Sequence, residues 1–479
     1  MSAEKVKTEG RRRPLCNTAL RSPSSGPIDP AWAWAPYEPD AARPWNLRWA
    51  GHLYRRAGFG GNWSQLQEAL GDGPQKAVDK LLRPQADVAA FNRTYDGHET
   101  ASIDPGSGST EGLCQWWLRR MIATPHPLLE KMTLFWHGYF GTSNVRVGHG
   151  VLMQRYVHLL REHALGRFPP LVRQLARDPA TLLSLGADAN RKARPNDRVA
   201  RALLEEYTLG PGNYSEQDVR ETARAMTGWF VLRGRLRFID REHDGGAKKI
   251  LGREGPWKDE DAVRIALEQP AAPCRVVRKL YRFLVSETDE PGDALLAPLA
   301  ESLAKDYDLA RLVETVLRSN LFFSPAAYRQ RVKSPVEFAL GIVRAFEEIL
   351  PTAPLDRDLT DLGQRLAHPP TVQGWPGGRV WINNFTLPRR SNLAWSMLAE
   401  AGPYGGKLDP AALARKHGAS SPEAASRLLV DLLLQGDVEP GAVQSILDGS
   451  AKSDAAGGLP RRLRRLAHSI VNLPEFHLA

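Results

Sequence analysis

The sequence predicts a mainly α-helical fold, in which one multi-helical large domain carries a single small β-hairpin. Apolar residues recur at the three- and four-residue spacing of a helix face in most segments of the chain. Neither an internal repeat nor an alternation of strands with helices is present. The chain has 479 residues, of which 42% are hydrophobic and 25% charged, as in soluble globular proteins with a large core.

We expect three regions along the chain. Residues 1–43 are rich in Pro, Ser, Ala and Arg, which predicts a disordered or loosely docked arm, pinned to the body by aromatic residues such as Trp34. Residues 44–400 are expected to form the main helical domain. Residues 401–479 begin with a linker-like stretch and continue as a small helical tail.

The helical segments are predicted from this spacing and from capping residues. Asn62 is an expected N-cap, and Pro74 takes the first position of a helix. Residues 84–110 are rich in Pro, Asp, Gly and Ser and are expected to form a loop. The other helices are expected, in chain order, at 63–70, 111–122, 127–139, 151–165, 170–176, 259–268, 274–285, 295–307, 309–319, 333–350, 356–366, 393–400, 421–434, 440–447 and 461–471.

Residues 190–229 form the stretch around which the chain is organised. Asn196 is expected to cap a first helix that ends at Gly210. Ser215 is expected to open a second helix in a capping box with Asp218. The two helices and their tight turn predict an αα-hairpin.

The β-hairpin is expected directly after this stretch, at residues 229–240. Their sequence, WFVLRGRLRFID, places β-favouring residues on both sides of the turn signal Arg233-Gly234.

The polar residues of the αα-hairpin allow two interpretations. They are Asn190, Lys192, Asn196, Arg201 and Glu205. In the first, they cap helices, and Arg201 pairs at the surface with Glu205, four residues later. In the second, they form a buried polar network beside a pocket, because buried polar groups must be satisfied or matched to a ligand. The second makes Glu205 a candidate catalytic base and the other four candidate ligand-binding residues.

A second candidate site is HDGGAKKILG at residues 243–252. His243 and Asp244 are residue types that bind metal, and His243 is also a candidate catalytic base. Two glycines follow and let the backbone approach a ligand closely, while Lys248 supplies a cation for ligand binding. The alternative is a turn in which Asp244 accepts a hydrogen bond from its own backbone.

Glu130 and His137 are seven residues apart in an expected helix, so they share a face. A carboxylate and an imidazole on one face are candidate metal ligands or an acid–base pair. The alternative is that His137, beside Trp136, is a satisfied structural residue.

Two tryptophans stand in the Pro- and Gly-rich stretch 369–392. Trp375 and Trp381 are candidate ligand-binding residues, because indole rings can form the floor of a pocket and stack on sugars or other rings. The alternative is that the stretch is a loop wedged against helices.

Several motifs together resemble one bacterial family, the domain of unknown function 1800. The longest is NDRVARALLEEYTLGPGNYSEQDVRETARAMTGW, and HDGGAKKILG, WNLRWAGHLYRRAGFGG and GWPGG are similar to further family motifs. The resemblance covers about 47–392, with a tail near the C-terminus. The chain departs from the family pattern at Gly138 and Tyr139, where the family has Asn and His, and at Ala202, where it has an acidic residue.

The resemblance implies a function only indirectly, because the family is uncharacterised. It implies a binding or assembly partner of a sulfatase-like protein from another uncharacterised family, numbered 1501. The alternative is an α-helical, metal-assisted, hydrolase-like enzyme of unknown substrate, with a divalent metal as cofactor. In such an enzyme His243 or Glu205 would act as the base, and Lys248 or Arg201 would hold an anion.

Charge and hydropathy limit the expected partners of the protein and its expected location. The formal net charge of +10 makes the chain basic, but its charges are mixed and no nucleic-acid-binding module is recognised, so nucleic acid is not an expected partner. The sequence contains no run of eighteen apolar residues, so we expect no membrane-spanning helix. The three arginines at 11–13 are not followed by an apolar segment, so we expect no signal peptide and a cytoplasmic protein. An exported protein is the alternative if the true start lies upstream.

Overall fold

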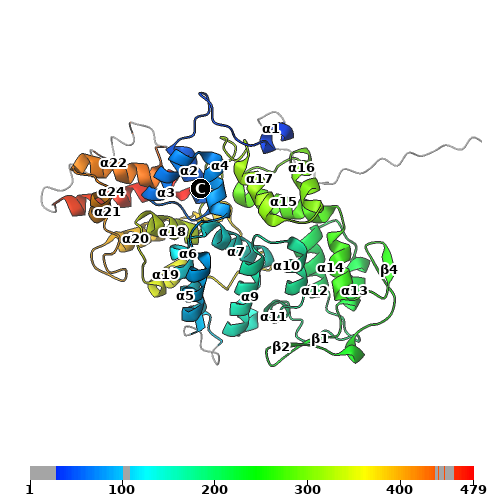
Figure 1. Cartoon of the computed structure of the whole chain (residues 1–479). Helices are drawn as coiled ribbons and strands as arrows, with labels where there is room; N and C mark the ends of the chain where they lie inside the picture. The colour runs from blue at the N-terminus through cyan, green and yellow to red at the C-terminus, as the bar shows by residue number, and fades with distance from the viewer. Residues whose placement is uncertain (1–27, 101–107, 437–440, 442–446, 448–457) are drawn as a thin grey trace, which may run out of the picture.

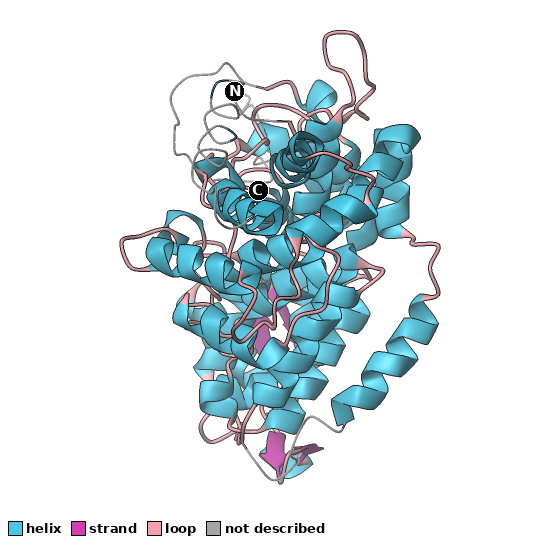
Figure 2. Cartoon of the chain, turned by 90° about the vertical axis from the view of Figure 1, so that its left-hand side faces the viewer, coloured by secondary structure: helices cyan, strands magenta, loops and turns pink. Residues whose placement is uncertain are grey.

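The predicted helical fold is confirmed. The computed structural model describes residues 28–100, 108–436, 441, 447 and 458–479, and helices make up most of them (Figures 1 and 2). The first helices are α1 (Pro30–Trp34), α2 (Leu47–Ala57), α3 (Trp63–Asp72), α4 (Pro74–Leu82), α5 (Val88–Thr100), α6 (Glu111–Ala123), α7 (Pro127–Phe140), α8 (Asn144–Val147), α9 (Gly150–His163), α10 (Phe168–Leu175) and α11 (Pro179–Ser184).

The remaining helices begin within the central stretch, residues 190–229, and continue to the end of the chain. They are α12 (Asp197–Arg201), the π-helix η1 (Ala202–Leu209), α13 (Glu216–Ala225), the short 3₁₀-helix η2 (Asp240–Glu242), α14 (Asp259–Leu267), α15 (Ala271–Leu284), α16 (Asp293–Ala304), α17 (Leu309–Arg318), α18 (Pro335–Ala345), α19 (Thr352–Asp361), the 3₁₀-helix η3 (Gly378–Trp381), α20 (Thr386–Leu398), α21 (Pro410–Lys416), α22 (Pro422–Leu434), α24 (Gly458–Val471) and α25 (Pro474–His477). No helix in the described part of the chain is long and apolar enough to cross a membrane.

Helix α7 is the centre of the fold. It is buried along nearly its whole length, including Glu130 and His137, as expected of a helix that is apolar on most sides. It packs against α2, α4, α6, α9 and η1, which come from different parts of the sequence. Segments on either side of α7 are therefore held in one continuous core.

Both ends of the described chain pack against internal segments. Helices α20, α21, α22 and α24 lie at the left of Figure 1 beside the N-terminal helices, and α9 to α17 lie at the right. The last residues return to the start of α18, where the backbone N–H of Lys333 donates to the carbonyl of His477 at 2.8 Å. Near the other end, the indole of Trp34 donates to the carbonyl of Leu295 at 2.7 Å, and Tyr37 is buried.

Two small antiparallel pairs of strands occur in the described residues. The predicted hairpin forms from β1 (Trp229–Leu232) and β2 (Arg235–Phe238), with Leu232 opposite Arg235 across the turn. A second pair, β3 (Lys248–Ile250) and β4 (Arg253–Gly255), was not predicted, because three-residue strands leave no alternating pattern in the sequence.

The predicted loop at 84–110 is wrong for its first half, which forms helix α5. The rings of Phe91 and Tyr95 stack at 4.2 Å, and the side chain of Asp96 accepts a hydrogen bond from Arg120 at 3.1 Å. These tertiary contacts outweigh the weak helix propensity of the segment. Residues 101–107, and most of the helix predicted at 440–447, lie outside the described residues.

Candidate functional site

The HDGG segment forms a turn that several hydrogen bonds hold in place. Asp244 accepts from the guanidinium of Arg224 at 2.7 Å and from the backbone N–H of Gly246 at 2.9 Å, and the pKa of its carboxyl is lowered chiefly by the first contact. Lys248 is buried, and its Nζ donates to the carbonyls of Asp244 and Gly246 at 2.5 and 2.8 Å. These are the contacts expected of the turn interpretation.

His243 and the αα-hairpin meet at the same end of the molecule. The Nδ1 of His243 lies 3.0 Å from the carbonyl oxygen of Thr227, directly after α13. The side chain of buried Asn190 accepts from the backbone N–H of Asn196 at 3.0 Å and donates to the carbonyl of Met226 at 2.9 Å. These contacts tie the start of the αα-hairpin to its end.

The remaining polar residues of the αα-hairpin differ in exposure. Asn196 caps α12 as predicted, because its side chain accepts from the backbone N–H groups of Arg198 and Val199. Lys192 is exposed, and its backbone N–H donates to the carbonyl of Glu242 at 2.9 Å. Asn190, Lys192, Asn196, Arg201 and Glu205 do not line the pocket described below.

The predicted ion pair between Arg201 and Glu205 is wrong. Arg201 instead makes two parallel hydrogen bonds to Glu216 at 3.1 and 2.8 Å, while the hydroxyl of Tyr214 donates to Glu205. A bidentate contact between a guanidinium and a carboxylate is stronger than a single contact along one helix. The fold of the αα-hairpin therefore overrides the four-residue spacing.

Glu130 and His137 are both fully buried, and both contact Trp117. Glu130 accepts from Arg120 at 2.8 Å and from Arg161 at 2.7 Å. Burial lowers the pKa of His137 to about 3, so its ring is neutral near pH 7. Within the described residues, no group of three or more His, Cys, Asp or Glu side chains is placed to hold a metal ion.

Trp375 and Trp381 line one pocket, although they are six residues apart in an irregular segment. The pocket has a volume of about 210 Å³ and lies between α7, α15 and the segment before α18. Its walls also include Phe135 and Tyr139 of α7 and Lys279 of α15. The pocket therefore combines aromatic rings with charged groups of both signs, since Arg282, Arg331, Glu287 and Glu337 also line it.

Close packing of glycines holds Trp375 against α7. A Cβ atom at Gly374, which has a φ of +82°, would lie 2.0 Å from the carbonyl oxygen of Gly138. The ring of Trp375 meets the ring of His137 edge to face, with 5.3 Å between centroids. Gly374 therefore has to be a glycine for Trp375 to reach this position.

A second hollow of about 730 Å³ adjoins this pocket, and its charged lining residues are four cations and Glu290. Arg275, Arg278, Lys279 and Arg282 line it from one face of α15, and Trp375 and Gln373 belong to both hollows. The three arginines have carboxylate partners: Glu206 for Arg275 at 3.4 Å, Asp293 for Arg278 at 2.7 Å, and Glu290 for Arg282.

Lys279 differs from its neighbours. Its Nζ has neither a carboxylate within ion-pair distance nor a hydrogen-bond acceptor in the part of the chain that the structure describes. Burial, together with the nearby charges of Arg275 and Arg282, lowers the pKa of Lys279 to about 8. Lys279 therefore lies where the two hollows meet, as a cation that an anionic ligand could neutralise.

The sequence analysis did not identify Glu206 or the four cations of α15, which belong to the surroundings of this cleft. Glu206, and not Glu205, accepts from the side chain of Gln373 at 2.9 Å and links η1 to the tryptophan segment. The sequence could have indicated Glu206 by its position, because it lies seven residues after Val199 and therefore on the same buried helix face. The four cations of α15 have the spacing i, i+3, i+4 and i+7, which places them on one helix face.

Comparisons with known proteins place the chain in a family. No curated protein and no solved structure matches it. Residues 52–478 match the family described as protein of unknown function (DUF1800), and the chain belongs to that family.

Proposed function

We propose that this protein binds an anionic ligand that carries a ring, in the cleft defined by Trp375, Trp381 and the basic face of α15. The observation that carries the proposal is Lys279, a partly buried cation that lacks a described partner and lies between two hollows beside an indole ring. A buried cation is stable only when it is neutralised or paired, and an anionic group supplies that pair.

The chemistry of the walls narrows the ligand class. Indole faces stack on flat rings and on the apolar faces of sugars. Guanidinium and ammonium groups bind sulfate, phosphate and carboxylate by charge-assisted hydrogen bonds. Gln364 and Gln373 add neutral hydrogen-bonding groups to the pocket. A sulfated or phosphorylated sugar has both a ring that can stack on the indoles and an anionic group that can bind the cations.

Calorimetric titration with three probes tests the proposal. Glucose 6-sulfate offers both ring and anion, glucose offers the ring, and inorganic sulfate offers the anion. We expect glucose 6-sulfate to bind more tightly than either part. Trp375→Ala and Lys279→Met should each weaken it about tenfold or more, since a hydrogen bond to a charged group contributes roughly 1.5–3 kcal/mol.

Matched variants outside the cleft separate this effect from a general loss of charge or aromatic surface. Trp395→Ala removes an indole that is 46% exposed, and Lys305→Met removes an exposed cation. Both should bind glucose 6-sulfate as the wild type does. The proposal fails if none of the probes binds, or if the cleft variants and the controls behave alike.

The two functions implied by the family resemblance remain predictions. A complex with a sulfatase-like protein is compatible with a cleft that takes a sulfated ring, and co-purification of the two proteins tests it directly. The metal-assisted enzyme is tested by metal analysis of the wild type and of the double variant His243→Ala, Asp244→Ala. A metal that is near-stoichiometric in the wild type and lost in the variant would support it.

A further inference from the structure

One face of the β1–β2 hairpin is rich in arginine. Residues directly opposite each other in an antiparallel pair project from the same face, so Phe230 lies with Arg237, and Leu232 lies with Arg235. Arg191 joins this face, because its guanidinium lies 5.1 Å from the centroid of the Phe230 ring. We call these five residues the arginine face.

The segment before α12 pairs with the hairpin and places Arg191 on this face. The backbone N–H of Val231 in β1 donates to the carbonyl of Asp188 at 2.8 Å, so the segment lies beside β1. On β2, Arg235 and Arg237 are two residues apart, which separates their Cα atoms by about 6.8 Å along the strand. The arginine face therefore presents its guanidinium groups along a line.

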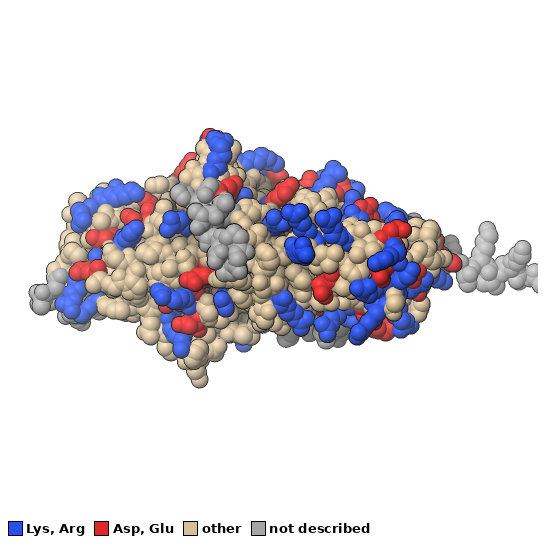
Figure 3. Space-filling model, turned by 90° about the horizontal axis from the view of Figure 1, so that it is seen from below, with Lys and Arg blue, Asp and Glu red and all other residues tan. Residues whose placement is uncertain are grey.

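Positive charge outweighs negative charge around the arginine face. Residues 188–198 and 233–242 contain eight Lys and Arg residues and four Asp and Glu residues. Arg191 pairs with Glu242 at 2.9 Å, whereas the two arginines of β2 are exposed and have no carboxylate within ion-pair distance in the described part of the chain. Figure 3 views the molecule from the side on which β1 and β2 lie in Figure 1, and Lys and Arg side chains gather there with fewer Asp and Glu side chains among them.

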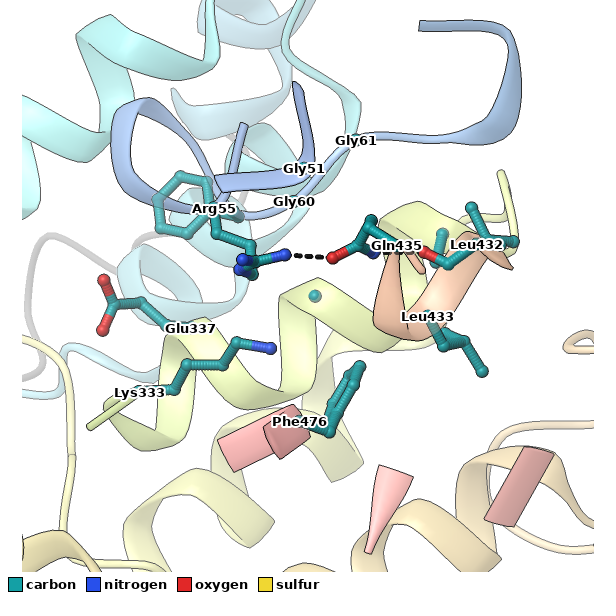
Figure 4. A pocket seen from close by; sticks show the side chains of 13 residues that line it. Gly51, Arg55, Gly60, Gly61, Lys333, Glu337, Leu432, Leu433, Gln435 and Phe476 are labelled. Atoms are coloured by element: carbon teal, nitrogen blue, oxygen red, sulfur yellow. Dashed lines mark hydrogen bonds between the residues drawn. The ribbon is translucent and has the colours of Figure 1, made fainter. Parts of the chain in front are cut away.

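The exposure of these cations distinguishes them from the buried cation Lys333. The Nζ of Lys333 lies 3.8 Å from the centroid of the Phe476 ring (Figure 4). The cavity that Lys333 lines together with Arg55 has a volume of about 20 Å³, and one water molecule needs about 10–15 Å³ by the same measure. The arginine face, in contrast, is open to a large ligand.

The composition of the arginine face narrows the class of its partner. Leu232, which is 49% exposed, is its one exposed large apolar side chain, and this is little for insertion into a lipid surface. Phe230 is buried, so the face offers no free aromatic ring for stacking on the bases of a single-stranded nucleic acid. Guanidinium groups bind sulfate by parallel charge-assisted hydrogen bonds, and such binding needs neither feature.

We propose that the arginine face binds a linear sulfated polysaccharide, with sulfate groups of one chain on Arg235 and Arg237. A linear polymer matches cations that are arranged along a strand, and each sulfate replaces a counterion beside a guanidinium group. The residues of the face line neither hollow of the tryptophan cleft. The proposal therefore does not rest on the function proposed for that cleft, and either can fail without the other.

A heparin octasaccharide is the probe, and the test variant is the double replacement Arg235→Gln, Arg237→Gln. Both side chains are exposed, so the variant should fold. Calorimetry should show binding weakened by about tenfold or more, because charge-assisted hydrogen bonds are lost at both positions. The matched control, Arg415→Gln with Arg427→Gln, removes the same charge from exposed positions on α21 and α22, at the other end of the molecule in Figure 1. The control should bind as the wild type does.

Three further measurements identify the partner and its site. The logarithm of the association constant should fall with the logarithm of the salt concentration, and the slope should be shallower by about one to two in the hairpin variant, because each contacting cation releases counterions. A DNA oligonucleotide, single-stranded or duplex, and vesicles containing phosphatidylserine should bind the wild type more weakly than the octasaccharide at equal ionic strength. Hydrogen exchange of residues 229–238 in the wild type should slow when the octasaccharide binds.

The outcomes decide the proposal. Weaker binding by the hairpin variant alone, with slower hydrogen exchange in the hairpin of the wild type, supports it. Equal losses in the hairpin variant and the control overturn it, because binding then follows net charge only. An oligonucleotide or vesicles that bind as tightly as the octasaccharide also overturn it, in favour of nucleic acid or a membrane surface. If the hairpin variant does not fold, hydrogen exchange in the wild type decides alone.

Discussion

The replacement Glu130→Gln tests whether this fully buried carboxylate is a structural ion pair. The amide keeps the shape of the side chain but removes its charge. Arg120, which is also fully buried, would then retain Asp96, a carboxylate with a 47% exposed side chain, as its acidic partner at 3.1 Å. Removing one member of a buried ion pair costs about 3–5 kcal/mol. Because Asp96 remains, we expect a loss near the lower end, about 3 kcal/mol.

Urea unfolding followed by tryptophan fluorescence measures this loss as a shift of the midpoint. The matched control is Glu68→Gln, since Glu68 is 57% exposed and pairs with Lys80 at the surface. Surface pairs contribute about 0–1 kcal/mol, so the control should unfold close to the wild type. A Glu130→Gln protein as stable as the control would refute the reasoning. Loss of a bound metal from Glu130→Gln would instead favour metal binding by this residue.

Three further predictions concern pH and the HDGG turn. Burial raises the pKa of Asp178 to about 6, so the folded state holds the proton more tightly than the unfolded chain. The free energy of unfolding should therefore fall by roughly 3 kcal/mol between pH 4 and 7 through this group, and Asp178→Asn should remove that fall in urea titrations. Binding of glucose 6-sulfate should weaken as pH rises through about 8, where Lys279 loses its proton; calorimetry of Lys279→Met should show no such step. Asp244→Ala breaks the contact with Arg224 and should lower stability by about 1–2 kcal/mol. It should leave probe binding unchanged, and a loss of binding would contradict a purely structural turn.

Local features of the structure were predictable where neighbouring residues decide them. Asn196 and Ser215 cap their helices as expected, because a cap depends on the next three residues. The hairpin turn at Arg233-Gly234 depends on residues that are adjacent in the sequence. Helix α5 was missed because distant partners such as Arg120 stabilise it.

The partners of charged residues required the tertiary structure. Arg201 pairs with Glu216 and not with Glu205, although the four-residue spacing in the sequence favoured Glu205. Glu130 is a candidate metal ligand in the sequence, and only the structure shows that it pairs with two arginines from other helices. Lys248 was a candidate ligand-binding residue, and its Nζ donates to carbonyls of its own turn.

The sequence by itself determined the helical class, the caps and the hairpin, because these depend on contacts within a few residues. It also determined the family, because long motifs carry that signal over residues 52–478. Only the tertiary structure decided that Trp375 and Trp381 share a pocket with α15, and that Lys333 faces Arg55. The physical reason is that a cleft between segments far apart in the chain is set by how helices pack around α7, and no local pattern records that packing.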